Sequence, residues 1–381
     1  MKKLLSQKIR SPISRFMTNF GGWRTNRKIV VFESDDWGSI RMPSKDVYQE
    51  CLKTGYRVDQ IAYEKYDSLA SEDDLELLFD LLSTFRDYKG NHPVITANTL
   101  VANPNFKKIK ESNYEQYHYE LITETFKKYS NHSNCINLWK SGIEEGVFFL
   151  QSHGREHLNV SMFMKALQEG DQDVHFAFNH EMPGSIPKNG SKGGNKYVEA
   201  LRYVNETDKL NKLAIVKEGL ELFEKIFGNK SESFIAPNYI WSPDFDKSIA
   251  EMGVLYYQGN RKMKEPCGDG SVNLMSHTLG EQNKFGQTYL VRNAMFEPAL
   301  FNIKVDDWVS KCLRDINIAF KMKKPAIICS HRLNYVGSLD EKNRDENLIL
   351  LNKLIKGVLK KWPNVEFFNT RELGREICEK N

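Results

Sequence analysis

The feature that most restricts the fold of this chain is a regular alternation of short apolar runs with longer helical patterns. The runs are rich in β-branched and aromatic residues and cover residues 28–34, 92–101, 146–153, 233–241, 254–260, 288–296, 324–331 and 365–370. Runs of this length and composition are typical of buried strands.

Patterns of helical period lie between these runs, over residues 72–86, 117–129, 209–228, 306–322 and 346–362. In the third of them, Leu213, Val216 and Leu220 recur at helical spacing, and Gly228 is suited to end the helix. Because parallel strands need a crossover connection, usually a helix, the alternation predicts an α/β fold with a parallel sheet. No linker interrupts it. We therefore expect a basic lead segment over residues 1–27 and one domain, a barrel or distorted barrel, over residues 28–381.

The composition excludes several classes of protein. Of the 381 residues, 40% are hydrophobic and 27% are charged, and the net charge is only +4, which is an ordinary globular mixture. Lys and Arg are scattered among Asp and Glu, so no nucleic-acid partner is predicted. No apolar run approaches the length of a membrane span. The six cysteines lie far apart without a Cys-x-x-Cys motif, which favours a reducing compartment over a disulfide framework or a thiolate zinc site.

The N-terminal residues 1–17 are basic but lack a continuous apolar core, so they are a poor secretory signal and we expect a cytoplasmic protein. Leu5, Ile9, Ile13 and Phe16 fall on one helical stripe, which Pro12 interrupts. Such a stripe usually packs against its own domain, although it could also lie on an anionic membrane surface. The prediction is therefore packing, with peripheral membrane contact by the N-terminus as the alternative.

Residues 183–196 are rich in Gly, Ser, Asn and Lys and predict an exposed loop. This loop is either a lid over a site or a mobile insertion, and the sequence leaves both open.

Polar residues follow most of the predicted strands. In a parallel α/β fold, reactive groups gather at the carboxyl ends of the strands, on one rim. The residues found there are Asp35, Asp36, His153, Pro237, Asn238, Tyr239, Arg292, Asn293 and His331. We expect them to lie near one another.

The adjacent carboxylates of Asp35 and Asp36 suggest a cation, because repulsion and desolvation both oppose two such charges at the end of a buried strand. His153 and His157 are separated by three residues, and on a helical turn both imidazoles would project from one face. Catalytic zinc keeps three protein ligands, so Asp36, His153 and His157 are the predicted ligands of zinc or another divalent cation. The alternative is that the aspartates cap the N-terminus of a helix, and that the histidines have a structural role in core packing or helix capping.

Three further roles complete this metal hypothesis. Zinc lowers the pKa of bound water to about 7, so Asp35 beside it could take the proton of the attacking water. His331 follows a buried strand and is suited to be a general acid, unless it is a satisfied core residue.

The turn at Pro237, with Asn238 and Tyr239, could bind substrate through main-chain N–H groups that hold an oxyanion, unless Pro237 merely ends a strand. Arg292, Asn293 and Glu297 are candidate orienting residues or substrate contacts; we place Arg292 among the substrate-binding candidates.

These residues together resemble the polysaccharide deacetylases of the NodB-homology type, carbohydrate esterase family 4. The family motif Thr-Phe-Asp-Asp-Gly is similar to residues 33–37, which implies that Asp35 is the base and Asp36 a metal ligand. The motif His-Ser/Thr-x-x-His is similar to residues 153–157, with both histidines as ligands. The motif Leu-x-His is similar to Cys329-Ser330-His331, which makes His331 the general acid.

The resemblance covers the chain from about residue 28 onward, and it has departures. The Thr and Gly of the first motif and the Arg of the third are absent, Gly154 stands where the family has Ser or Thr, and residues 234–239 match the third motif only in part. The family's Asp/Trp motif has no clear counterpart, since Asp307 and Trp308 begin an amphipathic pattern. The resemblance implies a distorted (β/α)7-type barrel that removes N-acetyl or O-acetyl groups from an amino sugar in a polysaccharide or glycan precursor.

Two other functions remain open at this stage. Residues 153–157 also spell H-x-x-E-H, the inverted zinc-peptidase motif with Glu156 as base, which requires a helix where residues 147–151 indicate a strand. The second alternative is a catalytically silent carbohydrate-binding protein, in which aromatic residues beside the rim stack on sugar rings. The aromatic candidates are Trp37, Tyr239, Trp241 and Tyr335.

Overall fold

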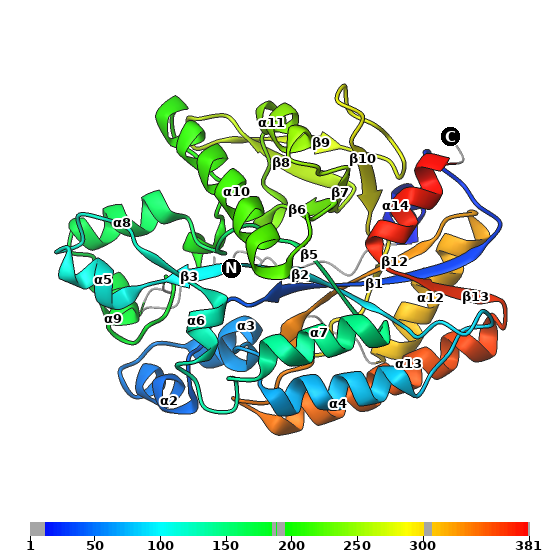
Figure 1. The fold of residues 1–381 in the computed structure, drawn as a ribbon, viewed down its shortest axis with the longest axis horizontal. Helices are drawn as coiled ribbons and strands as arrows, with labels where there is room; N and C mark the ends of the chain where they lie inside the picture. The colour runs from blue at the N-terminus through cyan, green and yellow to red at the C-terminus, as the bar shows by residue number, and fades with distance from the viewer. Residues whose placement is uncertain (1–11, 185–187, 189–194, 301–306, 380–381) are drawn as a thin grey trace, which may run out of the picture.

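The computed structural model describes residues 12–184, 188, 195–300 and 307–379, and its centre is a parallel sheet surrounded by helices (Figure 1). In spatial order the strands of the main path are β10 (Thr288–Val291), β7 (Tyr256–Gly259), β6 (Ser233–Ile235), β5 (Phe148–Ser152), β2 (Ile95–Thr99), β1 (Lys28–Trp37), β12 (Ala326–His331) and β11 (Ala294–Met295). Every neighbouring pair on this path is parallel. The predicted α/β class is therefore confirmed.

The sheet closes into a distorted barrel because β10 and β11 are two ends of one bent segment. Val291 of β10 is aligned with Gly259 of β7, whereas Ala294 of β11 is aligned with Ile328 of β12. Between them, the N–H of Arg292 donates to the carbonyl of Gly259 at 2.8 Å, and that of Asn293 to Ile327 at 3.1 Å. The chain thus crosses from β7 to β12 at Arg292, and the barrel has seven strands when β10 and β11 are counted as one.

Strand β1 is the central element of the barrel. Its apolar residues Ile29 to Phe32 are at most 1% exposed. Along one edge of β1, strand β13 (Val365–Phe368) pairs with the first half of β1 and β2 pairs with the second half. Strand β12 pairs along the opposite edge of β1. Burial of β1 on both sides explains why it reads as a continuous apolar run.

The long helices pack around the barrel. Figure 1 shows α4 (Glu72–Ser83), α7 (Cys135–Glu145) and α13 (Glu341–Lys361) side by side on one side, and α10 (Glu206–Phe227) and α11 (Asp246–Glu251) on the other. Helix α10 ends at Gly228, which has a φ of 77°, the left-handed conformation that glycine adopts without strain. Helix α12 (Trp308–Lys321) begins after Asp307, whose carboxylate accepts from the N–H of Ser310.

Smaller elements occupy the connections between strands, except for α14, which follows the last strand, β13. The helices are α2 (Lys45–Lys53), α3 (Ala62–Tyr66), α5 (Phe106–Glu111), α6 (Ile122–Phe126), α8 (Val160–Gln168), α9 (Gln172–Asn179) and α14 (Thr370–Glu379). Two antiparallel pairs lie outside the barrel, β3 (Ala102–Pro104) with β4 (Tyr119–Leu121), and β8 (Lys262–Pro266) with β9 (Val272–Ser276).

The helix expected over residues 117–129 is wrong in its first part. Residues 119–121 form β4 instead, because Glu120 pairs with Asn103 of β3, and only Ile122–Phe126 is helical. A tertiary pairing thus overrides the local helical period.

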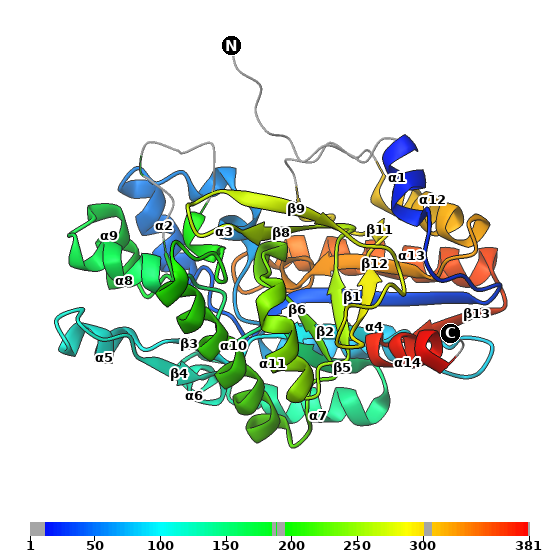
Figure 2. The ribbon, with the colours of Figure 1, turned by 90° about the horizontal axis from the view of Figure 1, so that it is seen from above.

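The described part of the lead segment lies on the barrel. Helix α1 (Pro12–Asn19) lies beside α12 (Figure 2), with Arg15 3.1 Å from the carboxylate of Asp315. Phe16 is nevertheless 52% exposed and Phe20 53%. Leu5 and Ile9 of the predicted stripe lie outside the described residues, as does most of the 183–196 loop. Among the residues that the structure describes, no helix is long and apolar enough to span a membrane.

Candidate active site

The two aspartates at the end of β1 reach the site together because the strand is irregular there. In a regular strand, neighbouring side chains point to opposite faces. Here Asp36 has a φ of 73°, and the pairing with β2 shifts register between Ser34 and Trp37. On the other side, Asp35 stays aligned with His331 at the end of β12. This local break in the pleat allows two successive carboxylates to serve one site.

Three side chains converge as the predicted metal ligands. Oδ1 of Asp36 lies 3.4 Å from Nε2 of His153 and 3.5 Å from Nε2 of His157. All three residues are buried. Nδ1 of His153 donates to the carbonyl of Ile235 at 2.9 Å, which orients the ring so that Nε2 faces Asp36. Burial lowers the pKa of His157 to about 3, so this imidazole is neutral and offers a lone pair.

This donor set fits a divalent cation. A carboxylate oxygen and two imidazole nitrogens converge here, and each of these groups can donate an electron pair to a cation. One carboxylate and two imidazoles are also a ligand set of catalytic zinc. The second oxygen of Asp36 lies 3.5 Å from Nη2 of Arg41, which leaves Oδ1 as the atom aimed at the histidines.

The histidines come together through a loop and not through the expected helical turn. Strand β5 ends at Ser152 and α8 begins at Val160, with no helical residue between them. Both carboxylate oxygens of Glu156 accept from Arg155, at 2.6 and 2.8 Å. The peptidase hypothesis is therefore wrong, since its helix is missing and Glu156 is held in a buried ion pair.

Asp35 is held in one orientation by the bend between β10 and β11. Arg292 donates from Nη1 to Oδ2 and from Nη2 to Oδ1 of Asp35, both at 2.7 Å. Asn98 donates to the same Oδ1 at 2.7 Å. Burial alone would raise the pKa of Asp35, but the charge and hydrogen bonds of Arg292, together with the nearby His331 and His153, outweigh burial and hold that pKa well below its usual value. Asp35 is therefore an ionised, oriented carboxylate.

Arg292 itself is fully buried, so it cannot contact a substrate. Its Nε donates to Glu33 at 2.6 Å, and Glu33 also accepts from Thr370 at 2.9 Å. Its assignment to the substrate-binding residues is corrected: Arg292 is a positioning residue for Asp35. Sequence reasoning missed Asn98 and Glu33; the one available signal was that Glu33 replaces the Thr of the family motif.

His331 faces Asp35 and is supported from behind by Glu297. Its Nε2 lies 3.6 Å from Oδ2 of Asp35, and its Nδ1 donates to Oε1 of Glu297 at 2.5 Å. Asn334 donates to the other oxygen of Glu297 at 2.7 Å. Burial lowers the pKa of His331, but the charge and hydrogen bond of Glu297, together with the charge of Asp35, outweigh burial and raise that pKa well above the usual value. The raised pKa favours the protonated form of His331, and its Nε2 faces Asp35.

The turn Pro237–Tyr239 lies beside these groups and offers fewer main-chain donors than expected. Pro237 has no N–H, and the N–H of Tyr239 donates to the carbonyl of Ala236 at 2.9 Å. The N–H of Asn238 remains the candidate oxyanion donor. The hydroxyl of Tyr239 accepts from Nη1 of Arg292 at 3.1 Å, which links this turn to the residue that binds Asp35.

The aromatic residues proposed to stack on sugars are mostly unavailable. Trp37, Trp241 and Tyr335 are each 1% exposed. Trp37 donates to Ser34 at 2.9 Å, and the hydroxyls of Tyr335 and Ser330 are hydrogen-bonded at 2.7 Å. A sugar-stacking surface built on these three residues is therefore wrong. Asn293 is also buried, where it donates to Asn19 and Pro325, so it belongs to the barrel and not to the site.

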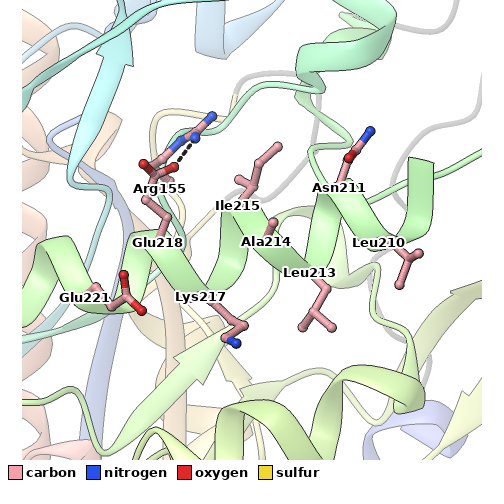
Figure 3. Close-up of a pocket in the computed structure, with 9 residues that line it drawn as sticks. All are labelled: Arg155, Leu210, Asn211, Leu213, Ala214, Ile215, Lys217, Glu218 and Glu221. Atoms are coloured by element: carbon pink, nitrogen blue, oxygen red, sulfur yellow. Dashed lines mark hydrogen bonds and ion pairs between the residues drawn. The ribbon is translucent and has the colours of Figure 1, made fainter. Parts of the chain in front are cut away.

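A separate open cavity of about 700 Å³ lies along α10 (Figure 3). Arg155, paired with Glu218 on α10, stands at its edge, and Leu210 and Leu213 line its apolar part. None of the predicted catalytic, metal-binding or substrate-binding residues lines it.

Comparison with known proteins gives the following likenesses. No family model matches the chain, and no curated protein matches it by sequence. Among solved structures, the match to a protein named as a polysaccharide deacetylase from Mycobacterium smegmatis covers 94% of this chain and 93% of that protein, with 12% sequence identity and a TM-score of 0.44. The match to a protein named as a glycoside hydrolase/deacetylase from Parabacteroides distasonis covers 94% of this chain and 72% of that protein, with 9% identity and a TM-score of 0.47. The match to a CE4 family pseudoenzyme from Bacillus anthracis covers 92% of this chain and 66% of that protein, with 9% identity and a TM-score of 0.38.

Proposed function

We propose that this protein is a metal-dependent deacetylase that removes an N-acetyl or O-acetyl group from an amino sugar in a polysaccharide or glycan precursor. The observation that carries the proposal is that Asp36, His153 and His157 converge beside an oriented carboxylate, Asp35, and a protonated imidazole, His331. A ligand set, a base and an acid within one group are the parts that hydrolysis of an amide or ester requires.

Asp35 is suited to be the base. A divalent cation held by Asp36, His153 and His157 would polarise the acyl carbonyl and make a nearby water more acidic. Oδ1 of Asp35 accepts hydrogen bonds from both Arg292 and Asn98. Oδ2 accepts one from Arg292 and none from Asn98, and it faces His331. Oδ2 is therefore the oxygen that takes the proton of the attacking water.

His331 is suited to be the acid. Its Nδ1–H donates to Glu297, which stabilises the positive charge of the ring, and Nε2–H faces the region beside Asp35. It would protonate the leaving amine nitrogen or alkoxide oxygen as the bond to the acyl carbon breaks. The N–H of Asn238 is the chain's own candidate donor to the oxyanion.

The carbohydrate substrate is proposed from the resemblance of residues 33–37, 153–157 and 329–331 to the deacetylase motifs. A cytoplasmic location is proposed because all six cysteines are unpaired, as is usual in a reducing compartment. The exposed rings of Phe16 and Phe20, 6.1 Å apart, support peripheral contact with a membrane surface as a further proposal.

The test is release of acetate from N-acetylated and O-acetylated oligosaccharides by the zinc-loaded protein. Asp35→Asn should abolish release, because the amide cannot accept the proton, while Asp269→Asn, in an exposed loop, should leave it unchanged. Equal release by wild type and Asp35→Asn would refute the assignment of the base. The absence of release from any acetylated glycan by the wild type would refute the proposed reaction.

A further inference from the structure

A second group of metal-ligating side chains lies on the same rim. In the described part of the chain, the Sγ atom of Cys329 and ligand atoms of Glu297 and His331 all lie within 4.8 Å of one another. Sγ of Cys329 is 3.9 Å from Oε1 of Glu297, which in turn is 2.5 Å from Nδ1 of His331. None of these three residues belongs to the Asp36 group.

The barrel places these three ligands together by strand geometry. Cys329 and His331 are two residues apart on β12, so their side chains point to the same face. Glu297 comes two residues after Met295, which β11 aligns with Cys329. The intervening Ser330 points away, to the hydroxyl of Tyr335. The cluster is therefore a consequence of the parallel pairing of β11 with β12.

The chemistry of the cluster suits a zinc-class cation. Sulfur, imidazole nitrogen and carboxylate oxygen are the donors that zinc takes, and a thiolate selects zinc and softer ions over magnesium or calcium. Burial raises the pKa of the Cys329 thiol, so the ion has to displace the thiol proton. Nη1 of Arg292, 3.4 Å from Sγ, is a neighbouring positive charge that opposes the effect of burial. Cys329 and His331 are partly exposed, so an ion can reach them from solvent.

We propose that Glu297, Cys329 and His331 form a second binding site for a zinc-class divalent cation, and that its occupation inhibits the enzyme. The ion replaces the proton on Sγ of Cys329 and the proton on Nδ1 of His331. Both protons leave to solvent, and no electron is transferred. The proposed binding does not depend on the enzymatic function of the protein. The proposed inhibition does rest on the proposed function, because a metal-bound imidazole no longer carries the charge that makes His331 an acid.

The sequence did not indicate this site, because the cysteines lack the close spacing of thiolate zinc motifs. One cysteine is sufficient here, since the fold supplies the other two ligands. Cys329 also stands where the deacetylase motif has Leu, so the site is a property of this chain.

The test is a titration of the metal-free full chain with Co²⁺. The Asp36 group contains no sulfur, so a near-ultraviolet thiolate-to-cobalt charge-transfer band reports only a cysteine ligand. We expect wild type to bind two equivalents and to develop this band, and Asp36→Ala to bind one equivalent and retain it. Cys329→Ser should lose the band and weaken the second equivalent by more than about tenfold, while keeping the first. Cys267→Ser, which removes an exposed thiol, should behave as wild type.

Absence of the band in wild type overturns the proposal, as does a band that persists in Cys329→Ser. The wild-type result does not depend on whether any variant folds. Excess Zn²⁺ should inhibit acetate release by wild type at concentrations about tenfold lower than for Cys329→Ser; equal sensitivity overturns the inhibitory role. Binding with the band but without any deacetylase activity would leave the second site standing and refute only the proposed function.

Discussion

Asp35 and Arg292 are joined by two hydrogen bonds of 2.7 Å, one from each terminal nitrogen of the guanidinium to each oxygen of the carboxylate. They are far apart in sequence, on the central strand and at the bend where the barrel closes. The bend that converts an open sheet into a barrel is thus also the element that orients the proposed base.

Arg292→Lys should lower kcat by about a hundredfold and leave KM within about threefold of wild type. A lysine ammonium cannot donate to both oxygens in one plane, so Asp35 loses its orientation but keeps a cation nearby. Steady-state kinetics on an acetylated oligosaccharide measure this split. A rise in KM at unchanged kcat would show instead that position 292 acts through substrate binding.

Asp36→Ala should reduce the affinity for Zn²⁺ by at least about a hundredfold, because it removes the one anionic ligand of the group. Competition with a chromophoric chelator, in a Cys329→Ser background that weakens the second proposed site, measures the affinity of the Asp36 group without relying on activity. Asp80→Ala, which removes an exposed carboxylate of α4, is the matched control. Unchanged affinity in Asp36→Ala would contradict the assigned ligand set.

Glu297→Gln should shift the basic limb of the pH–rate profile to lower pH. The acid must be protonated, so activity falls as the pH rises through the pKa of His331. Glu297 raises that pKa, and loss of its charge lets burial lower it. The control is Glu281→Gln, which alters another Glu–His pair, with His277 at 3.4 Å. A pH–rate profile identical to that of wild type would show that His331 is not the general acid.

The same raised pKa predicts a linked change in stability. A histidine whose pKa is higher in the folded state than the unfolded value of about 6.5 stabilises the fold fully below that value, and this contribution is lost as the pH rises through the folded pKa. Wild type should therefore lose stability relative to Glu297→Gln above about pH 6.5, as measured by urea unfolding across pH. A constant difference between the two would contradict it.

Glu156→Gln should retain most of the activity while lowering the free energy of unfolding by about 2 kcal/mol, because it weakens a buried charge-assisted pair with Arg155. Denaturant unfolding and acetate release together separate the two effects. Complete loss of acetate release in a folded variant would show that Glu156 takes part in the reaction and is not only a structural partner of Arg155.

Gly219→Ala should weaken metal binding although it removes no ligand. A Cβ at Gly219 of α10 would lie 2.7 Å from the main-chain nitrogen of Arg155, in the loop between His153 and His157. The loop must move or the helix must shift, which typically costs about 1–3 kcal/mol. Gly357→Ala is the control, since its Cβ would meet only the end of the Leu313 side chain, at 2.9 Å. Equal Zn²⁺ affinity in both variants would show that α10 does not position the loop.

The sequence by itself determined the order of strands and most helices, because period and composition are local properties. Each predicted apolar run contains a strand, and the residues that end β1, β5 and β12 lie near one another, since parallel strands bring their carboxyl ends to one rim. The region 117–129 could not be predicted in this way, because its strand exists only through pairing with Asn103 and its neighbours.

Only the tertiary structure decided which candidate residues lie in the site and which of them hold other residues in position. Arg292 was a candidate either for orienting another residue or for contacting the substrate, and its burial and its two hydrogen bonds to Asp35 favour the first role. Glu156 and the aromatic side chains of Trp37 and Trp241 looked functional in the sequence and are held in the interior. The physical reason is that a side chain's role depends on its direction, its burial and its partners, and those partners come from segments that local patterns cannot align.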